Sequence, residues 1–177
     1  MVRTVIDKTI FLDRDGVLNK AIVINNKPKS PKNSKELVLN KKIKKILSKI
    51  KKNYYLICIT DQPEVGRNKF IKKDIEEINQ IVKNYFGLDD ILTCYHERDK
   101  ICDCRKPNIG MLEKAKDKFS INFKKSIVIG DRWRDVSMGK KVGCKTIFVD
   151  YKYDETLKDQ PDIKINNLKE LENYVPI

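Results

Sequence analysis

Residues 8 to 19 read Lys-Thr-Ile-Phe-Leu-Asp-Arg-Asp-Gly-Val-Leu-Asn, so a short apolar run leads directly into two aspartates, Asp13 and Asp15. The apolar residues 10 to 12 predict a buried strand, and Gly16 allows a turn where a side chain would clash. Two carboxylates held this close repel each other unless a cation or a proton lies between them. Because Mg²⁺ takes oxygen ligands and bridges to phosphate, the pair indicates a magnesium site at the end of a strand. Taken alone, the motif also fits solvated caps at an ordinary strand end.

The length and the cysteine content bound the class of protein. A chain of 177 residues is about the size of one domain, and we expect a single domain over residues 1–177. No apolar run approaches the roughly 20 residues of a membrane span, and the N-terminus lacks the apolar centre of a signal peptide, so we expect a cytoplasmic protein. The five cysteines are an odd number, which indicates reduced thiols or metal ligands instead of a disulfide framework.

The formal net charge of +13 invites a nucleic-acid hypothesis. Lysine outnumbers arginine 31 to 7, and the lysines are spread through every expected helix, a pattern that composition bias also produces. We therefore expect solvated helix faces and no nucleic-acid partner, with a polyanion-binding surface as the alternative. We also expect no membrane contact and a monomeric protein. In either case the positive field would speed the encounter with small anionic substrates.

Apolar runs that suit buried strands alternate along the chain with helical patterns. Strands are expected at residues 9–12, 54–59, 91–95, 126–130 and 146–150, with a weak one near residue 163. Helices are expected at residues 43–50, about 68–86, 111–119, from about 135 to Gly143 and 168–174, with a polar loop over residues 21–34. This alternation predicts a three-layer α/β fold, a mostly parallel Rossmann-like sheet with helices on both faces.

Polar groups follow several of these expected strands. Beyond the first pair they are Thr60, Asp61, Lys106, Asp131 and Asp135. In open α/β sheets the carboxyl ends of the strands are where ligands bind. Taken together, the stretch Phe-Leu-Asp-Arg-Asp-Gly-Val-Leu-Asn, Thr60, Lys106 and the segment Gly-Asp-Arg-Trp-Arg-Asp at residues 130–135 resemble the four motifs of the haloacid dehalogenase-like phosphohydrolase superfamily.

This resemblance implies the chemistry of a phosphatase that uses a carboxylate nucleophile. Asp13 would attack phosphorus to form an aspartyl-phosphate. Asp15 would protonate the departing alkoxide and then deprotonate the attacking water. Mg²⁺ bound by Asp13, the backbone carbonyl of Asp15 and Asp131 would neutralise charge on the transferring phosphoryl group.

Four further residues have implied roles around the same phosphate. The Thr60 hydroxyl, the backbone N–H of Asp61 and the Lys106 ammonium would hold phosphoryl oxygens, and Asp135 would orient Lys106. Read singly, Thr60 could be a strand-end cap, Lys106 one lysine among 31, and Asp135 a residue at the start of a helix. The joint pattern favours the catalytic interpretation.

A second group of residues predicts a zinc site in the loop over residues 94–104. Its members are Cys94, His96, Cys102 and Cys104, and the group contains the only histidine of the chain. Three thiolates and one imidazole suit tetrahedral Zn²⁺ in a closed structural site, with a disulfide or unpaired thiols as the alternatives. Folding of this loop on zinc would place Lys106, which follows two residues later. The other cysteines, Cys58 and Cys144, suit the core.

The zinc loop narrows the resemblance to the branch of D-glycero-D-manno-heptose 1,7-bisphosphate phosphatases and related histidinol-phosphatases. The pattern Cys-x-His, Cys-x-Cys and Arg-Lys-Pro carries it. Members of this branch have no separate cap domain, which implies that the loop over residues 21–34 and the zinc loop gate the site. Arg67 and Arg105 are candidate contacts for a second phosphate on the substrate, because a guanidinium fork suits phosphate.

The second motif departs from its usual form in this branch. It reads Thr60-Asp61-Gln62-Pro63 in place of Thr-Asn-Gln-Ser-Gly, and the zinc loop is short. A carboxylate at position 61 is unfavourable near phosphate unless it points away or pairs with a cation. The resemblance implies a magnesium-dependent, zinc-stabilised sugar-phosphate phosphatase, with the 7-phosphate of a heptose 1,7-bisphosphate as its target. A histidinol-phosphate phosphatase is the alternative enzyme, and a polynucleotide 3′-phosphatase or a basic nucleic-acid-binding protein is the alternative of another class.

Overall fold

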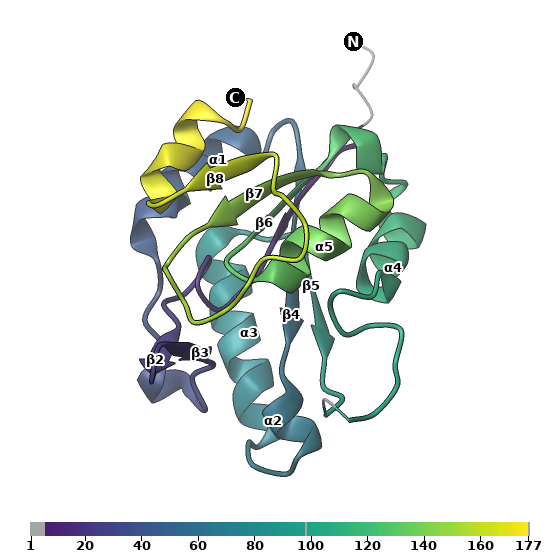
Figure 1. Ribbon diagram of the computed structural model, residues 1–177. Helices are drawn as coiled ribbons and strands as arrows, with labels where there is room; N and C mark the ends of the chain where they lie inside the picture. Colours follow the sequence, from purple (N-terminus) through teal and green to yellow (C-terminus); the bar gives the residue numbers. More distant parts are fainter. Residues whose placement is uncertain (1–5, 98, 177) are drawn as a thin grey trace.

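A computed structural model describes residues 6–97 and 99–176, and a parallel six-stranded sheet forms its centre (Figure 1). The strand order is β5-β4-β1-β6-β7-β8. The strands are β1 (Thr9–Leu12), β4 (Tyr55–Asp61), β5 (Asp90–Cys94), β6 (Ile127–Gly130), β7 (Lys145–Val149) and β8 (Ile163–Ile165). A separate antiparallel hairpin pairs β2 (Ile22–Ile24) with β3 (Lys27–Lys29).

Helices cover both faces of this sheet (Figure 1). The α-helices are α1 (Lys44–Ile50), α2 (Pro63–Gly66), α3 (Lys72–Phe86), α4 (Gly110–Phe119) and α5 (Trp133–Val142). Short 3₁₀ helices are η1 (Ser34–Glu36), η2 (Lys41–Ile43), η3 (Phe123–Lys125) and η4 (Leu168–Asn173). Apolar side chains of α1, α3 and η4 pack on one face, and those of α4 and α5 pack on the other. The predicted three-layer α/β fold is confirmed.

The central strand β1 shows why the strands are continuous apolar runs. All four of its residues are buried, and Phe11 pairs with Ile57 on one side and Val128 on the other. Ile10 and Leu12 belong to the core layer beneath α1 and α3, whereas Phe11 belongs to the layer beneath α4. A strand whose two faces are both covered by helices has no solvent side, so it has no need of alternating polar residues.

Several boundaries differ from the sequence expectation. The helix expected from about residue 68 begins at Lys72, because Asn68 adopts a left-handed conformation with φ of 57° and Ile71 is extended. The final helix, expected over residues 168–174, is a 3₁₀ helix from Leu168 to Asn173. The polar loop over residues 21–34 contains the β2–β3 hairpin, whose turn is made by two asparagines with positive φ, Asn25 and Asn26.

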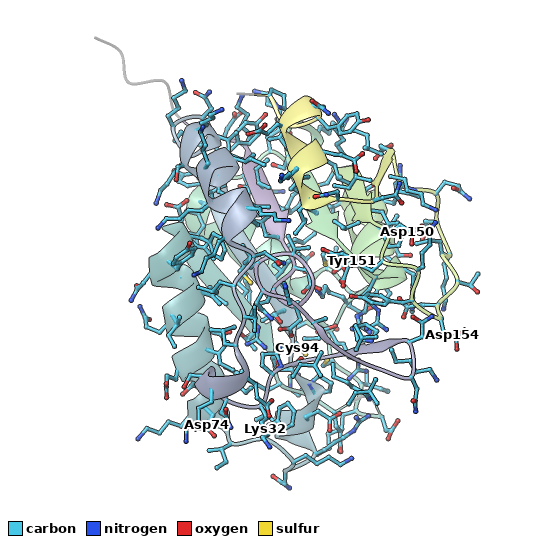
Figure 2. The ribbon with its side chains drawn as sticks, turned by 90° about the vertical axis from the view of Figure 1, so that its left-hand side faces the viewer. Lys32, Asp74, Cys94, Asp150, Tyr151 and Asp154 are labelled. Atoms are coloured by element: carbon cyan, nitrogen blue, oxygen red, sulfur yellow. The ribbon has the colours of Figure 1, made fainter. Side chains whose placement is uncertain are left out.

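The long loop after β7 lies beside this hairpin. Figure 2 labels Tyr151 and Asp154 on that loop, and the Asp154 backbone N–H donates to the Asn26 carbonyl at 3.1 Å. The Asn26 side-chain amide donates to the Lys152 carbonyl at 2.9 Å, and the Tyr151 hydroxyl donates to the Gly16 carbonyl at 2.9 Å. These bonds attach the hairpin and the β7 loop to the turn that follows β1.

In the described parts of the chain, residues 6–97 and 99–176, every helix is too short or too polar to cross a membrane.

Candidate active site

The turn after β1 brings Asp13 close to Asp131, the residue that follows β6. The Asp13 backbone N–H donates to the Ile129 carbonyl at 2.9 Å, which continues the pairing of the two strands by one residue. Gly16 has φ of 107°, and a Cβ atom built on it would lie 1.9 Å from Asp131 Oδ2. The predicted need for glycine at this turn therefore has two causes, a backbone conformation that L-residues avoid and the close approach of a carboxylate.

Replacing Gly16 with alanine is expected to lower the free energy of unfolding by more than about 2 kcal/mol, because both the positive φ and the contact with Asp131 oppose a methyl group. Urea denaturation measures the change. Gly143→Ala is the matched control: Gly143 also has positive φ, 75°, but no described residue lies within 4 Å of the place that a Cβ would take there, so a loss of only about 1 kcal/mol is expected. Equal losses in the two variants would contradict the proposed contact.

Lys106 lies at the centre of the site. Its buried ammonium is 2.8 Å from Asp13 Oδ1 and 2.7 Å from Asp135 Oδ1, and it donates to the Ile59 carbonyl at 3.2 Å. Burial opposes the charge, but the carboxylates of Asp13, Asp135 and Asp61 outweigh it and raise the pKa of Lys106. The lysine is therefore a fixed positive charge that joins the ends of β1 and α5.

Three carboxylates at this edge of the sheet fit a divalent cation. One oxygen from each of Asp13, Asp131 and Asp135 lies within 4.8 Å of the others. Both carboxylate oxygens of Asp131 are buried, and neither has a hydrogen-bond partner among the described residues. Burial, with the charges of Asp13 and Asp135, raises the pKa of Asp131 well above its usual value. A hard cation would satisfy these oxygens and offset the excess negative charge that one lysine leaves.

Asp15 occupies a different environment from these three acids. Its two oxygens accept hydrogen bonds from the Arg14 guanidinium at 3.1 Å, and from the side chains of Asn19 at 3.0 Å, Ser30 at 2.7 Å and Gln62 at 2.8 Å. Burial opposes ionisation, but the Arg14 charge and these hydrogen bonds lower the pKa of Asp15. The carboxylate is therefore ionised at neutral pH and fixed in orientation.

The sequence interpretation missed Arg14 as part of the site. This arginine is fully buried, and its Nη1 donates to Asn79 Oδ1 of α3 at 2.8 Å while the rest of the fork holds Asp15. Its position between two motif aspartates was the only available signal. Nothing in the local sequence distinguishes it from a solvated arginine, because its anchor, Asn79, lies 65 residues away.

The end of β4 supplies Thr60, Asp61 and Gln62. The Gln62 side-chain amide donates to both Thr60 Oγ1, at 2.9 Å, and Asp15 Oδ2. Asp61 Oδ1 accepts the Lys106 backbone N–H at 3.3 Å, and Asp61 Oδ2 lies 3.4 Å from Arg134 Nε. The carboxylate at position 61 thus pairs with a cation, which was one of the two conditions stated for tolerating it near phosphate.

A pocket opens at these strand ends. Its walls are formed by Asp13, Asp15, Pro28, Lys29, Ser30, Asp61, Pro63, Glu64, Lys106, Arg132 and Arg134. The β2–β3 hairpin and the start of α2 therefore contribute to it, together with the motif residues. Arg67 and Arg105 do not line this pocket. Arg67 pairs with Glu64 at 2.5 Å, and the Arg105 guanidinium donates to the backbone carbonyls of Glu97 and Lys100.

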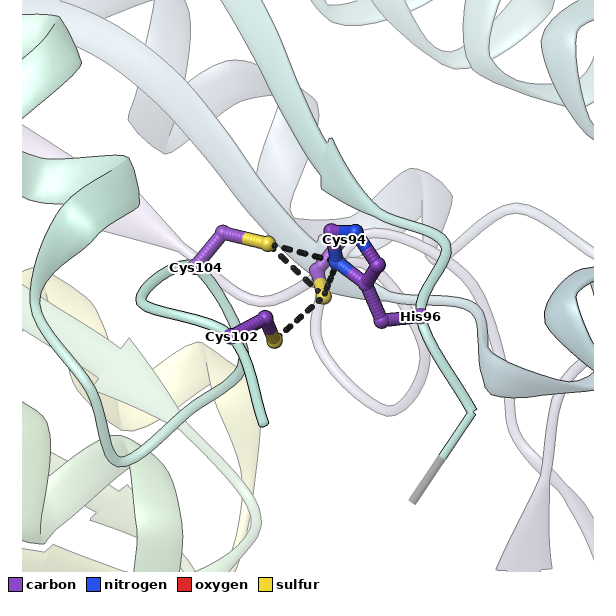
Figure 3. Close-up of side chains that lie close together, drawn as sticks. All are labelled: Cys94, His96, Cys102 and Cys104. Carbon is purple, nitrogen blue, oxygen red and sulfur yellow. Dashed lines mark hydrogen bonds between the residues drawn. The ribbon is translucent and has the colours of Figure 1, made fainter. Parts of the chain in front are cut away.

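The four predicted zinc ligands converge at the end of β5 (Figure 3). Cys94 Sγ lies 3.8 Å from Cys102 Sγ and 3.0 Å from Cys104 Sγ, distances too long for a disulfide bond of about 2.05 Å. His96 Nδ1 lies 3.5 Å from Cys94 Sγ and 3.2 Å from Cys104 Sγ. All four ligand atoms lie within 4.8 Å of one another.

This cluster fits a tetrahedral metal ion. Zn–S bonds of about 2.3 Å place sulfur atoms of one tetrahedron about 3.8 Å apart, which matches the Cys94–Cys102 separation, whereas the Cys94–Cys104 separation of 3.0 Å would have to widen around a bound ion. Burial raises the pKa of the Cys94 thiol, so without a cation its ionised form is unfavourable. A bound cation would stabilise the thiolates of Cys94 and Cys104, and the chain continues from Cys104 to Lys106 within two residues.

Comparisons with known proteins identify the family of this chain. A model of the HAD-hydrolase-like family matches residues 103–171. A protein of Photorhabdus laumondii named D-glycero-alpha-D-manno-heptose-1,7-bisphosphate 7-phosphatase is 35% identical over 155 residues, which cover 80% of this chain and 81% of the relative. The chain belongs to the haloacid dehalogenase-like hydrolases. The predicted family and the predicted enzyme class, a phosphatase, are confirmed.

Two further relatives of this hydrolase extend the comparison. The histidine biosynthesis bifunctional protein HisB of Buchnera aphidicola is 36% identical over 147 residues, and the chain covers only 40% of that protein's length. The crystal structure of D,D-heptose 1,7-bisphosphate phosphatase from B. bronchiseptica, complexed with magnesium and phosphate, superposes with a TM-score of 0.79 at 21% identity. That superposition covers 94% of this chain and 96% of the other, and it shows that the two share a fold.

Proposed function

We propose that this hydrolase removes the 7-phosphate of D-glycero-D-manno-heptose 1,7-bisphosphate through an aspartyl-phosphate on Asp13. The observation that carries the reaction is the Lys106 ammonium, held 2.8 Å from Asp13 and 2.7 Å from Asp135 beside three clustered carboxylates. The substrate is supported by the Photorhabdus relative, which matches four fifths of this chain. The chain would act as one domain over residues 1–177, without a separate cap, as a monomer in the cytoplasm.

Asp13 would be the nucleophile through its second carboxylate oxygen. Its Oδ1 accepts the Lys106 ammonium and the Arg14 backbone N–H, each at 2.8 Å. Oδ2 would attack phosphorus in line with the leaving sugar oxygen, forming the aspartyl-phosphate as the ester bond breaks. Water would then attack the same phosphorus and release inorganic phosphate, which regenerates the Asp13 carboxylate.

Asp15 would transfer the proton in both steps. The negative charge of a phosphate bound beside it raises the pKa of a carboxyl group, so substrate binding would favour the protonated acid that the leaving alkoxide needs. Once the sugar has left, the Asp15 carboxylate would take a proton from the attacking water. Its five hydrogen bonds from Arg14, Asn19, Ser30 and Gln62 would hold it in position for both transfers.

The remaining phosphoryl oxygens would be bound by groups around the same edge. The Thr60 oxygen already accepts from Gln62, which leaves the Thr60 hydroxyl hydrogen for the phosphate. The Lys106 ammonium and the Asp61 backbone N–H would donate to the same group. Mg²⁺ bound by Asp13, the Asp15 backbone carbonyl and Asp131 would supply charge neutralisation.

Zn²⁺ would be structural, bound by the four residues that meet at the end of β5. This assignment is supported by the closed set of three thiols and one imidazole, which leaves no position for a substrate. The zinc loop and the β2–β3 hairpin would border the entrance to the pocket.

A substrate panel tests the proposed function. Released phosphate is measured with heptose 1,7-bisphosphate, histidinol phosphate and DNA carrying a 3′-phosphate, with Mg²⁺ present. We expect kcat/KM for the heptose bisphosphate to exceed the others by at least about a hundredfold, because neither of the other two presents a second phosphate monoester to the groups that would bind one. The identity to HisB favours histidinol phosphate as the second candidate. A higher kcat/KM with histidinol phosphate or with DNA would overturn the substrate assignment.

A further inference from the structure

Four cationic side chains line the pocket, and they differ in whether carboxylates of the protein already bind them. Lys106 is held between two carboxylates, and Arg132 forms a two-pronged ion pair with Glu155, with Arg132 Nε 2.7 Å from the carboxylate. Lys29 is exposed on the hairpin. Arg134 is different, because its side chain is only 21% exposed and yet no hydrogen bond from its guanidinium is found within residues 6–97 and 99–176.

Asp61 explains why a mostly buried guanidinium lies here. The Asp61 side chain is 5% exposed, and its Oδ2, which has no hydrogen-bond partner among the described residues, faces Arg134 Nε at 3.4 Å. Burial raises the pKa of Asp61, and the charges of Lys106 and Arg134 oppose that shift. Each partner offsets the cost of burying the other, and the pair removes the repulsion that an isolated carboxylate would exert on an anion in the pocket.

We propose that Arg134 binds a second anionic group of the substrate, and that Asp61 is the positioning residue that holds Arg134 over the pocket. A guanidinium has five N–H donors in a rigid fork, and Asp61 approaches only the one on Nε. The four donors on the two Nη atoms are those that bind a phosphate in two-pronged fashion. In this respect the inference rests on the proposed function, because it assumes that the substrate carries a second phosphate.

The other arginines near the pocket are less suited to this role. Arg105 is occupied by two backbone carbonyls of the zinc loop, and Arg67 is paired with Glu64; neither lines the pocket. The geometry therefore moves the second-phosphate contact from these two arginines, which the sequence suggested, to a residue on the first turn of α5. The second motif has Asp61 where its usual form has asparagine, and this departure becomes part of the same arrangement, because the Asp61 carboxylate supplies the charge that anchors Arg134.

The test compares two ligands that differ by one phosphate. Glucose 1,6-bisphosphate and glucose 6-phosphate are titrated by calorimetry into the full chain loaded with Mg²⁺, in an Asp13→Asn background that prevents turnover. We expect Arg134→Met to raise the Kd of the bisphosphate about tenfold to a hundredfold and that of the monophosphate less than about threefold. Lys114→Met, which removes an exposed charge on α4, is the control for net charge and should change neither Kd.

A double-mutant cycle tests the role of Asp61. Asp61→Asn is expected to weaken binding of the bisphosphate about threefold to tenfold relative to the monophosphate. Arg134→Met should weaken binding of the bisphosphate much less in a chain that already carries Asp61→Asn than in a chain that keeps Asp61. If the pair were only structural, both variants would lower the melting temperature and leave the ratio of the two Kd values unchanged. Arg134→Lys keeps the charge without the fork and should recover only part of the affinity.

Two further outcomes would overturn the inference. One is an Arg134→Met variant that weakens both ligands equally or neither. The other is a selective loss of the bisphosphate in Arg67→Met or Arg105→Met while Arg134→Met binds it normally. Failure of the proposed function is distinguishable, since a chain that does not hydrolyse heptose 1,7-bisphosphate can still show the Kd ratio that depends on Arg134.

Discussion

Replacing Asp13 with asparagine is expected to reduce phosphate release at least about ten-thousandfold, because an amide cannot form the aspartyl-phosphate. The measurement is inorganic phosphate released from the best substrate of the panel, with Mg²⁺ present. The loss should appear in kcat and not in KM, because the asparagine keeps an oxygen that accepts from Lys106 and the phosphate site is otherwise unchanged. Turnover within about tenfold of the unmodified protein would refute the nucleophile assignment.

The same substitution should leave the fold intact. Lys106 retains its contacts with Asp135 and with the Ile59 carbonyl, and removing one carboxylate relieves repulsion with Asp131 and Asp135. We expect a melting temperature within a few degrees of the unmodified protein. Asp162→Asn is the matched control. Asp162 accepts the Thr146 backbone N–H at 2.7 Å, and it does not line the pocket. That variant should lower the melting temperature and keep its kcat.

The placement of the motif residues was predictable because strand order and strand ends follow from the sequence pattern. Asp13 and Asp131 each come directly after a short apolar run, and in a parallel sheet such runs all end at the same edge. Lys106 was harder, since no strand leads directly to it. It was assigned through the resemblance to the third motif of the superfamily, and the cysteine spacing beside it predicted only that a metal-bound loop would position it.

What the sequence could not supply are contacts between residues far apart in the chain. The Asp61–Arg134 pair joins two elements 73 positions apart, and the Arg14–Asn79 bond joins two others. The fit of a guanidinium fork to phosphate suggested Arg67 and Arg105 as contacts for a second phosphate. Nothing in the sequence shows that Arg105 is occupied by carbonyls of its own loop. Side-chain pairing of this kind depends on tertiary packing, which hydrophobic periodicity does not encode.

Removal of one zinc ligand should disturb the active site as well as the metal. Cys102→Ser is expected to lower zinc from about one equivalent per chain to less than half, as measured on protein purified without chelator. We expect its melting temperature to fall by several degrees, because a bound metal would order a loop whose described residues after Cys94 form no helix or strand. Cys144→Ala is the control, since Cys144 is a buried thiol outside the cluster, and its zinc content should stay at one equivalent.

Loss of zinc is expected to affect catalysis through Lys106. Cys104 belongs to the cluster, and Lys106 follows it by two residues. A looser loop should therefore allow the Lys106 ammonium to leave the carboxylates of Asp13 and Asp135. A fall of about tenfold or more in kcat is therefore expected in Cys102→Ser, and a misplacement of about 1 Å is enough to cause it. A variant that loses its zinc and keeps full kcat would show that the strand ends alone hold the lysine. Unmodified protein with less than half an equivalent of zinc would refute the metal assignment itself, because the cluster would then be three reduced thiols and a histidine without a metal ion.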